Sequence, residues 1–167
     1  MGVKNHRKHG AKVVVAAILT VSDTRNRRTD ETGKVIRQLL EKAGHKVVRQ
    51  GIVKDERKEI LYWLRDALAN PSIHAILING GTGIARRDVT IEVVRPMFEK
   101  ELPGFGELFR MLSYKDIKGA AMMSRATAGT CKGKIIFCLP GSPDAARLAL
   151  EGLILSDLGH LVWETKR

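Results

Sequence analysis

The sequence predicts an α/β protein of three layers, in which helices cover both faces of a mostly parallel central sheet. First, short apolar runs alternate along the chain with segments whose apolar residues recur at helical spacing. Second, the first run is rich in β-branched residues and apolar throughout, as expected of a parallel strand buried on both faces. Third, glycine-rich or polar turns follow the strands, at the edge where such sheets bind ligands.

Four core strands are expected, over residues 13–21, 46–53, 73–79 and 134–139. Four main helices are expected, over residues 32–43, 56–70, 90–100 and 143–163. Gly44 and Pro71 mark the ends of the first two helices, and Pro96 limits or kinks the third. Pro143 suits the first turn of the last helix. The order strand–helix–strand–helix–strand implies right-handed crossovers.

Two further segments have weaker signals. Residues 103–106, which read Pro-Gly-Phe-Gly, predict a turn that leads into a helical stretch ending near residue 111. Residues 124–132 predict either an irregular loop or an edge strand. No internal repeat or linker is visible, so residues 12–167 are expected to form one domain and residues 1–11 a mobile basic arm.

The chain of 167 residues carries a formal net charge of +11, which suits a nucleic acid, a small polyanion or plain solubility. Only 5% of the residues are aromatic, which argues against binding of single strands by base stacking. Nucleic acid is therefore the least favoured partner. No apolar run reaches membrane-spanning length, so no membrane association is expected.

The cysteines and histidines predict no metal site. Cys131 and Cys138 lie outside any metal-ligand or redox spacing and are expected to be reduced core thiols, which favours a cytoplasmic protein. His45 and His74 precede apolar runs and are expected to be ordinary surface or turn residues.

The run from Gly80 through Gly81 and Thr82 to Gly83 is the most informative feature of the chain. Glycine lets backbone N–H groups approach a ligand without a Cβ atom in the way. Arg87 and Asp88 follow within five residues. Backbone donors, a cation and an acid after a strand suit a phosphate with a bound metal ion, whereas a plain turn with an incidental charge cluster is the alternative.

Four strand ends are expected to converge on one edge of the sheet. Polar groups follow each of them, in the segments Ser22-Asp23, Asp55, Gly80 to Gly83 and Pro140-Gly141-Ser142. Asp55 and Asp88 are candidate acids that could hold Mg²⁺, although either could be a capping or surface acid. Ser142 could donate a hydrogen bond to phosphate or serve as the N-cap of the last helix. Walker A, GxGxxG, GxSxG and HExxH motifs are absent from the sequence.

These segments together resemble the molybdopterin-binding family of molybdenum-cofactor biosynthesis, whose members include MoaB and MogA. The resemblance covers nearly everything from Lys12 to Trp163, and residues 104–116 are more similar to the MoaB branch. The matching stretches, in order, are Leu19-Thr20-Val21-Ser22-Asp23, Gly80-Gly81-Thr82-Gly83 with Arg87-Asp88-Val89-Thr90, Pro103-Gly104-Phe105-Gly106-Glu107, Met123-Ser124-Arg125-Ala126 and Leu139-Pro140-Gly141-Ser142-Pro143.

The resemblance implies adenylyl transfer, in which molybdopterin is joined to AMP with consumption of ATP, participation of Mg²⁺ and release of pyrophosphate. It implies a homotrimer or homohexamer and a downstream metal-insertion protein as partner. The two important acidic positions of the family match Asp55 and Asp88. The expected binding residues are Ser22, Asp23, Gly80, Gly81, Thr82, Gly83, Arg87, Ser124, Arg125, Pro140, Gly141 and Ser142.

Two positions depart from the family pattern. Arg86 stands where a proline often precedes the Arg-Asp pair, and Lys54 stands where a proline often precedes Asp55. Both changes add charge, and neither removes an acid. Some MoaB-branch proteins bind the pterin without adenylylating it, so a catalytically silent carrier or assembly protein is the alternative function.

Overall fold

The computed structural model describes residues 11–167, and the expected arm over residues 1–11 falls almost entirely outside the described residues. A six-stranded sheet forms the middle layer, in the strand order β2-β1-β3-β6-β5-β4. The strands are β1 (Val15–Val21), β2 (Lys46–Val53), β3 (Ala75–Asn79), β4 (Lys100–Glu101), β5 (Thr127–Cys131) and β6 (Lys134–Leu139). The first three strands and β6 pair in parallel, whereas β5 is antiparallel to both neighbours. The predicted mostly parallel sheet is confirmed.

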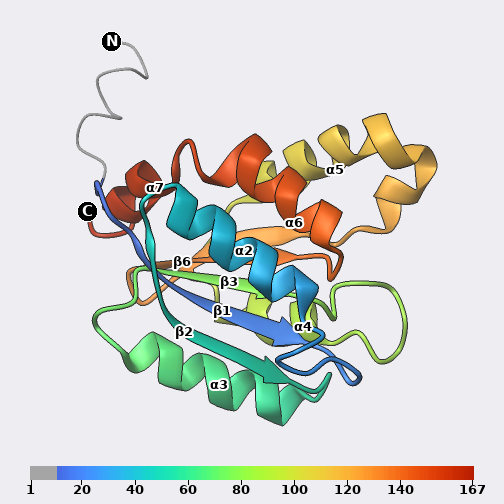
Figure 1. Cartoon of the computed structure of the whole chain (residues 1–167), viewed down its shortest axis with the longest axis horizontal. Coiled ribbons are helices and arrows are strands. Elements are labelled where there is room, and N and C mark those ends of the chain that lie inside the picture. Colours follow the sequence, from blue (N-terminus) through green and yellow to red (C-terminus); the bar gives the residue numbers. More distant parts are fainter. Residues whose placement is uncertain (1–10) are drawn as a thin grey trace.

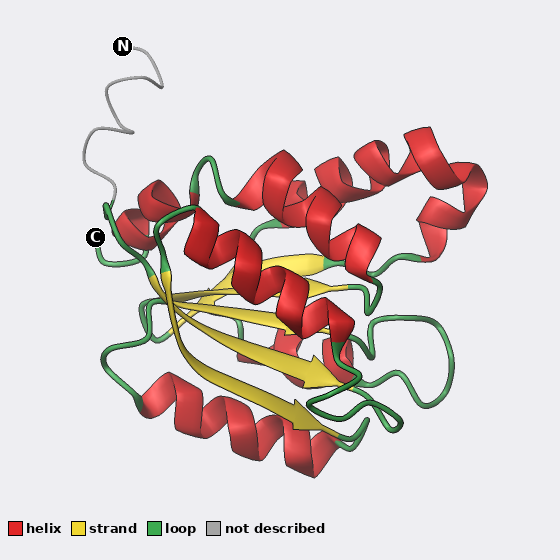
Figure 2. Ribbon diagram, viewed as in Figure 1, coloured by secondary structure: helices red, strands yellow, loops and turns green. Residues whose placement is uncertain are grey.

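Helices cover both faces of the sheet (Figure 1). One face carries α2 (Glu31–Lys42), α5 (Pro103–Ile117), α6 (Pro143–Ala149) and α7 (Leu158–Glu164), and the other carries α3 (Arg57–Ala69) and α4 (Thr90–Val94). Short turns of other helix types complete the chain: η2 (Arg95–Met97), η3 (Lys118–Met123) and the π-helical turn η4 (Leu150–Ile154). Figure 2 shows the sheet enclosed between the two helical layers. The three-layer prediction is therefore confirmed.

The pleat of the central strands divides the core into two apolar layers. Along β1, Ile18 packs toward α2 and α6, whereas Leu19 packs toward α3. Leu77 and Ile78 of β3 divide in the same way. Because both faces are covered, these strands are apolar without alternation, which explains why the sequence signal was a continuous run.

Three predicted elements need correction. The helix expected over residues 90–100 ends at Val94, because Pro96 lacks an N–H group, and Lys100–Glu101 instead forms the short edge strand β4. Residues 103–106 are the first turn of α5 rather than a separate turn, since Pro103 occupies an initial helical position. Residues 124–132 contain β5, which lies between β4 and β6 and is no edge strand.

The last helix is also interrupted. Instead of one helix over residues 143–163, α6 passes into the π-helical turn η4, and α7 begins only at Leu158. Gly152 and the Ser156-Asp157 pair lie where the helix changes, and these residue types have low helix propensity. The described residues include no helix with the length and apolar character needed to cross a membrane.

His45 and His74 hold the start of β1, a role that differs from the expected surface positions. The Nδ1 atom of His45 accepts a hydrogen bond from the N–H of Val14 at 3.2 Å, and that of His74 accepts one from Val15 at 3.3 Å. Burial lowers the pKa of both imidazoles, and the nearby charges of Lys166 and Lys134 lower the pKa of His74 further. Both rings are therefore held neutral.

These contacts predict that acid loosens the amino-terminal end of β1. A histidine whose pKa is lowered by folding contributes its full stability above the unfolded value of about 6.5 and loses it as the pH falls below that value. We expect the urea midpoint to fall between pH 7.5 and pH 5.5. In the double variant His45→Asn/His74→Asn, the amide oxygens accept the same hydrogen bonds but do not titrate in this range. The decrease in its urea midpoint between pH 7.5 and pH 5.5 should therefore be at most half of that in the unmodified protein. An unchanged pH dependence in the variant would contradict this role.

Candidate functional site

The carboxyl ends of β2, β1, β3 and β6 lie at one edge of the sheet, where the connecting loops are joined by main-chain hydrogen bonds. Ser22 N–H donates to the carbonyl of Val53 at 2.8 Å, and Gly80 N–H donates to the carbonyl of Leu139 at 3.1 Å. The convergence expected from the sequence is therefore present. In Figure 1 these loops lie at the end of the sheet opposite the carboxyl terminus.

The two glycines after β3 are required by close packing. Both have positive φ angles, of 91° at Gly80 and 63° at Gly81. A Cβ atom on Gly80 would lie 2.2 Å from the carbonyl oxygen of Val21, and one on Gly81 would lie 2.3 Å from both Asp55 Oδ1 and Thr90 Oγ1. Only glycine satisfies the conformation and the space together. The loop over residues 80–88, called the glycine loop below, is thereby placed directly against Asp55.

A cavity of about 380 Å³ opens on the glycine loop. Asp88, Ser124 and residues 140–142 line its polar side, and Phe109, Ile117 and Met123 line its apolar side. A neighbouring cavity of about 400 Å³ shares Ser142 and Ile117 with it. The structure thus brings together most of the predicted binding residues in one space of the size that takes a small ligand.

The two candidate acids contact different residues of the glycine loop, Asp55 at Gly81 and Asp88 at Gly83. Asp88 lines the cavity, and its Oδ2 atom accepts a hydrogen bond from the N–H of Ala85 at 2.9 Å. The Asp55 Oδ1 atom is buried behind Gly81 and accepts no hydrogen bond of standard geometry from the described residues, although the main-chain N–H of Val89 lies close enough to lower the pKa of this carboxyl. Burial raises the pKa of Asp55, and the charges of Asp23 and Asp88 raise that pKa further.

This arrangement fits a divalent cation. An unpartnered, buried carboxylate oxygen beside two other carboxylates is a position that positive charge would stabilise. Residues 11–167 nevertheless contain no cluster of three histidine, cysteine, aspartate or glutamate side chains arranged to hold a metal ion. Asp55 and Asp88 are therefore the protein groups available to it, and phosphate oxygens would complete the coordination, as Mg²⁺ commonly requires.

Arg87 is already bound to carboxylates. Its Nε atom lies 2.8 Å from Asp23 Oδ2, its Nη2 atom 3.0 Å from Asp23 Oδ1, and its Nη1 atom 2.9 Å from Glu56 Oε1. The fork geometry with Asp23 is the bidentate form that arginine favours, and this bond lowers the pKa of Asp23. Asp23 Oδ1 also accepts the N–H of Asp55 at 3.1 Å. Arg87 therefore ties the glycine loop to the loops after β1 and β2.

Arg125 ties the other side of the same loop. Its Nε atom donates to the carbonyl of Thr82 at 3.2 Å, and its Nη2 atom donates to the carbonyl of Asp88 at 3.4 Å. The guanidinium also forms an ion pair with Glu92 of α4, which lowers the pKa of that carboxyl. One side chain thus holds both the beginning and the end of the glycine loop.

The three predicted serines all accept main-chain hydrogen bonds in their own turns. Ser142 Oγ accepts from the N–H of Ala145 at 3.2 Å and is the N-cap of α6. Ser22 Oγ accepts from Arg25 N–H at 3.2 Å, and Ser124 Oγ accepts from Ala126 N–H at 3.4 Å. Capping does not consume the hydroxyl proton, so each serine retains a donor for an anion.

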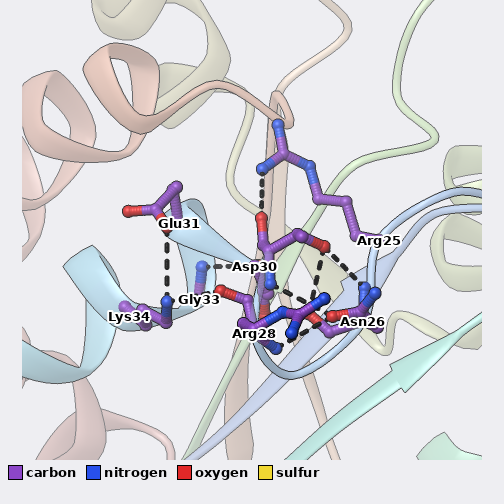
Figure 3. Close-up of polar contacts among 8 residues, drawn as sticks. Arg25, Asn26, Arg28, Asp30, Glu31, Gly33 and Lys34 are labelled. Atoms are coloured by element: carbon purple, nitrogen blue, oxygen red, sulfur yellow. Dashed lines mark hydrogen bonds and ion pairs between the residues drawn. The ribbon is translucent and has the colours of Figure 1, made fainter.

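Several supporting residues were missed by the sequence analysis. Asp30 is 1% exposed and accepts the hydroxyl of Thr20 at 2.8 Å and the N–H of Gly33 at 2.9 Å. Its place as N-cap of α2, three residues before a glycine amide, was the available signal. Figure 3 shows Asp30 between α2 and the loop that carries Arg25 and Asn26. Thr90 Oγ1 donates to the carbonyl of Gly80 at 2.8 Å, a contact without a local sequence signal.

Comparisons with known proteins show the family to which the chain belongs. The family model described as a probable molybdopterin binding domain matches residues 17–160. Molybdenum cofactor biosynthesis protein B of Halalkalibacterium halodurans is 52% identical over 165 residues, which cover 98% of this chain and 97% of that protein.

Solved structures give the same result. A crystal structure of a molybdenum cofactor biosynthesis protein B superposes with a TM-score of 0.90 at 47% identity, over 93% of this chain and 98% of the other. The tungsten cofactor synthesizing protein MoaB from Pyrococcus furiosus superposes with a TM-score of 0.85 at 36% identity, over 94% of this chain and 99% of the other. The chain belongs to the molybdopterin-binding MoaB family of molybdenum and tungsten cofactor biosynthesis.

Proposed function

We propose that this protein binds molybdopterin and ATP at the glycine-loop edge and transfers AMP to the terminal phosphate of the pterin. The observation that carries the proposal is the buried, unpartnered Oδ1 atom of Asp55 directly behind Gly81. A carboxylate in this position, with Asp88 across the loop, provides negative charge where a metal-bound phosphate group needs it. The family model supplies molybdopterin as one substrate, and ATP as the second follows from the resemblance of the motifs.

In this reaction an oxygen of the terminal phosphate of molybdopterin attacks the α-phosphorus of ATP. A new P–O bond forms, the bond between the α-phosphorus and the bridging oxygen to the β-phosphorus breaks, and pyrophosphate leaves with the bonding electron pair. Such a step depends on positioning and on neutralisation of charge rather than on a covalent nucleophile. Mg²⁺, held by Asp55 and Asp88, would supply part of that neutralisation.

The protein's own groups have separate tasks in this scheme. The main-chain N–H groups of residues 81–83 and the hydroxyls of Ser124 and Ser142 donate to phosphate oxygens. Arg87 and Arg125 are engaged with carboxylates, so we assign them to holding the loop rather than to direct phosphate contact. This differs from the role that the resemblance suggested for these arginines.

A catalytically silent molybdopterin carrier is the second candidate function. The specific observation in its favour is that Arg87 and Arg125 are paired with acids, which leaves Arg86 as the arginine of the glycine loop outside any ion pair within residues 11–167. We place either activity in the cytoplasm, before the step of a metal-insertion protein that takes the product. The metal, molybdenum or tungsten, would be inserted after this step.

A homotrimer or homohexamer is proposed on the basis of an exposed apolar surface on α5 and η3. Its large side chains are between 46% and 81% exposed, and a contact between subunits would cover them. They are Leu108, Met111, Tyr114, Ile117, Met122 and Met123.

The acids are tested by an assay of pyrophosphate release with molybdopterin, ATP and Mg²⁺. Asp88→Asn and Asp55→Asn should each lower turnover by about 10²-fold or more, because each removes a charge at the site. The amide oxygen introduced by Asp88→Asn can still accept the N–H of Ala85, so the loop should remain folded. Asp66→Asn, in an exposed ion pair on α3, is the matched control. Pterin binding without turnover in the unmodified protein would instead establish the carrier.

Arg125 is tested as a positioning residue by amide hydrogen exchange without any ligand. Arg125→Gln removes the ion pair and part of the donor set, so exchange over residues 82–89 should accelerate by roughly fivefold or more. Turnover should fall by about tenfold, since hydrogen bonds from charged groups contribute about 1.5–3 kcal/mol. Glu92→Gln should give a smaller change in the same segment, and Arg125→Lys should restore part of the protection. Unchanged amide exchange in Arg125→Gln would show that Arg125 does not hold the glycine loop in place.

The subunit surface is tested by light scattering on the purified protein. Met111→Asp/Met122→Asp places two charges on the exposed apolar surface and should convert an oligomer into a monomer. Tyr62→Asp changes a side chain that is 79% exposed on α3 and should leave the mass unchanged. A monomeric unmodified protein, or an oligomer that survives the double change, would contradict the assignment.

A further inference from the structure

A second cavity, of about 890 Å³, lies beside the glycine-loop edge but outside the glycine-loop cavity. It is enclosed by the loop after β1, by α2 and by the carboxyl end of β2, and it meets the proposed catalytic edge at Ser22 and Asp23. Its volume is within the range of small-molecule sites. Of the predicted binding residues, Ser22 and Asp23 reach this cavity, and the proposed reaction assigns no occupant to the rest of its wall.

The cavity is lined by more cations than acids. Five basic residues contribute to its wall, namely Arg25, Arg27, Lys34, Arg37 and Lys54, against three acidic residues, Asp23, Asp30 and Glu59. The cations come from three separate segments of chain, so the cluster is produced by the fold and not by a run of basic sequence.

The acids on this wall are already engaged. Asp23 is bound by Arg87, and Asp30 is buried and accepts from Thr20 and Gly33. Glu59 accepts the main-chain N–H of Lys54 at 3.0 Å. Of these three acids, Asp23 alone is paired with a cation within the described part of the chain, and the five basic residues of the wall outnumber the acids.

Three of the cations have no hydrogen-bonded acidic partner within residues 11–167, although the charge of Lys54 acts on the nearby Asp23. Arg25 donates to the neutral carbonyl of Thr29 at 3.1 Å, and neither Arg27 nor Lys54 makes a side-chain hydrogen bond or ion pair within residues 11–167. Lys34 and Arg37, in contrast, have Glu31 and Glu41 as partners. The uncompensated positive charge is therefore concentrated on the loop and at the end of β2.

The loop that carries Arg25 and Arg27 is held in one conformation by its own hydrogen bonds before any ligand binds. Asn26 Oδ1 accepts the N–H groups of Arg28 at 3.0 Å and Thr29 at 3.2 Å, and Lys34 Nζ donates to the carbonyl of Arg28 at 2.7 Å. Figure 3 shows these bonds closing the loop against the first turn of α2. An anion that enters the cavity meets guanidinium groups on an ordered loop, which lowers the entropy cost of binding.

We propose that this cavity binds a small molecule that carries phosphate groups, through Arg25, Arg27 and Lys54. Phosphate is the anion that guanidinium groups match in geometry, and a cavity of this depth admits the rest of a small molecule. Both substrates proposed above carry phosphate, but the inference requires only binding and does not depend on adenylyl transfer.

Calorimetric titration with inorganic pyrophosphate at a fixed ionic strength of about 0.15 M tests the proposal, because salt screens non-specific attraction at that strength. Arg27→Gln/Lys54→Gln removes two unpaired charges from the cavity and should weaken binding by at least about tenfold, which corresponds to roughly 1.4 kcal/mol. Lys42→Gln/Arg65→Gln removes the same charge from exposed positions elsewhere and should leave the affinity within about twofold. Circular dichroism checks that both variants are folded.

Several results would overturn the proposal. Equal weakening in both double variants would show that only net charge matters, and an absence of pyrophosphate binding would remove the site. A loss in Ser142→Ala as large as in Arg27→Gln/Lys54→Gln would place the anion in the glycine-loop cavity. Displacement of pyrophosphate by a lower concentration of a single-stranded oligonucleotide would assign the surface to nucleic acid. Failure of AMP transfer alone, with this pattern of pyrophosphate binding intact, would leave the inference standing.

Discussion

The contact of the glycine loop with Asp55 is the constraint on which the rest of the site depends. Gly80 and Gly81 turn the chain at the end of β3 with positive φ angles and leave no space for a Cβ atom on either residue. Thr90 fixes the turn by donating to the carbonyl of Gly80 and by the bond of its N–H to the carbonyl of Gly81 at 3.0 Å. The loop is therefore held in one conformation with the Asp55 carboxylate against Gly81. A larger residue at Gly80 or Gly81 would displace the residues of the glycine loop that follow.

The fold could be predicted from the sequence because the dominant signals are local. Continuous apolar runs and the residues that end helices identify the central strands and α2 and α3, and the bounds of β2 agree at both ends. The errors lie where local signals compete with tertiary contacts. Pro103 and Gly104 are typical of a turn, yet they begin α5, because Gly106 packs where a Cβ atom would lie 2.5 Å from the carbonyl oxygen of Ala126. The two-residue strand β4 exists through its pairing with β5 and has no pattern of its own.

The site residues could be located from the sequence, but their interactions could not. Strand order fixes which turns meet, so Ser22, Asp55 and Gly80 were expected at one edge. The ion pairs join residues that are far apart in the sequence. Asp23 and Arg87 are separated by 64 positions, and Glu92 and Arg125 by 33, so no local pattern shows which charges pair. A guanidinium next to an expected phosphate site looks the same in sequence whether it binds the phosphate or holds the loop.

This distinction changes how the positive charge of the protein is understood. The net charge of +11 suggested attraction of polyanions, yet Arg87 and Arg125, which hold the glycine loop, are paired with acids, whereas Arg86 of the same loop is exposed. Paired surface charges contribute little to long-range attraction, whereas unpaired ones contribute most of the field. Arg25, Arg27 and Lys54 have no hydrogen-bonded acidic partner within residues 11–167 and line the neighbouring cavity, so they add to the field that would draw phosphate compounds to this edge. Positioning and attraction are therefore carried by different arginines of the same surface.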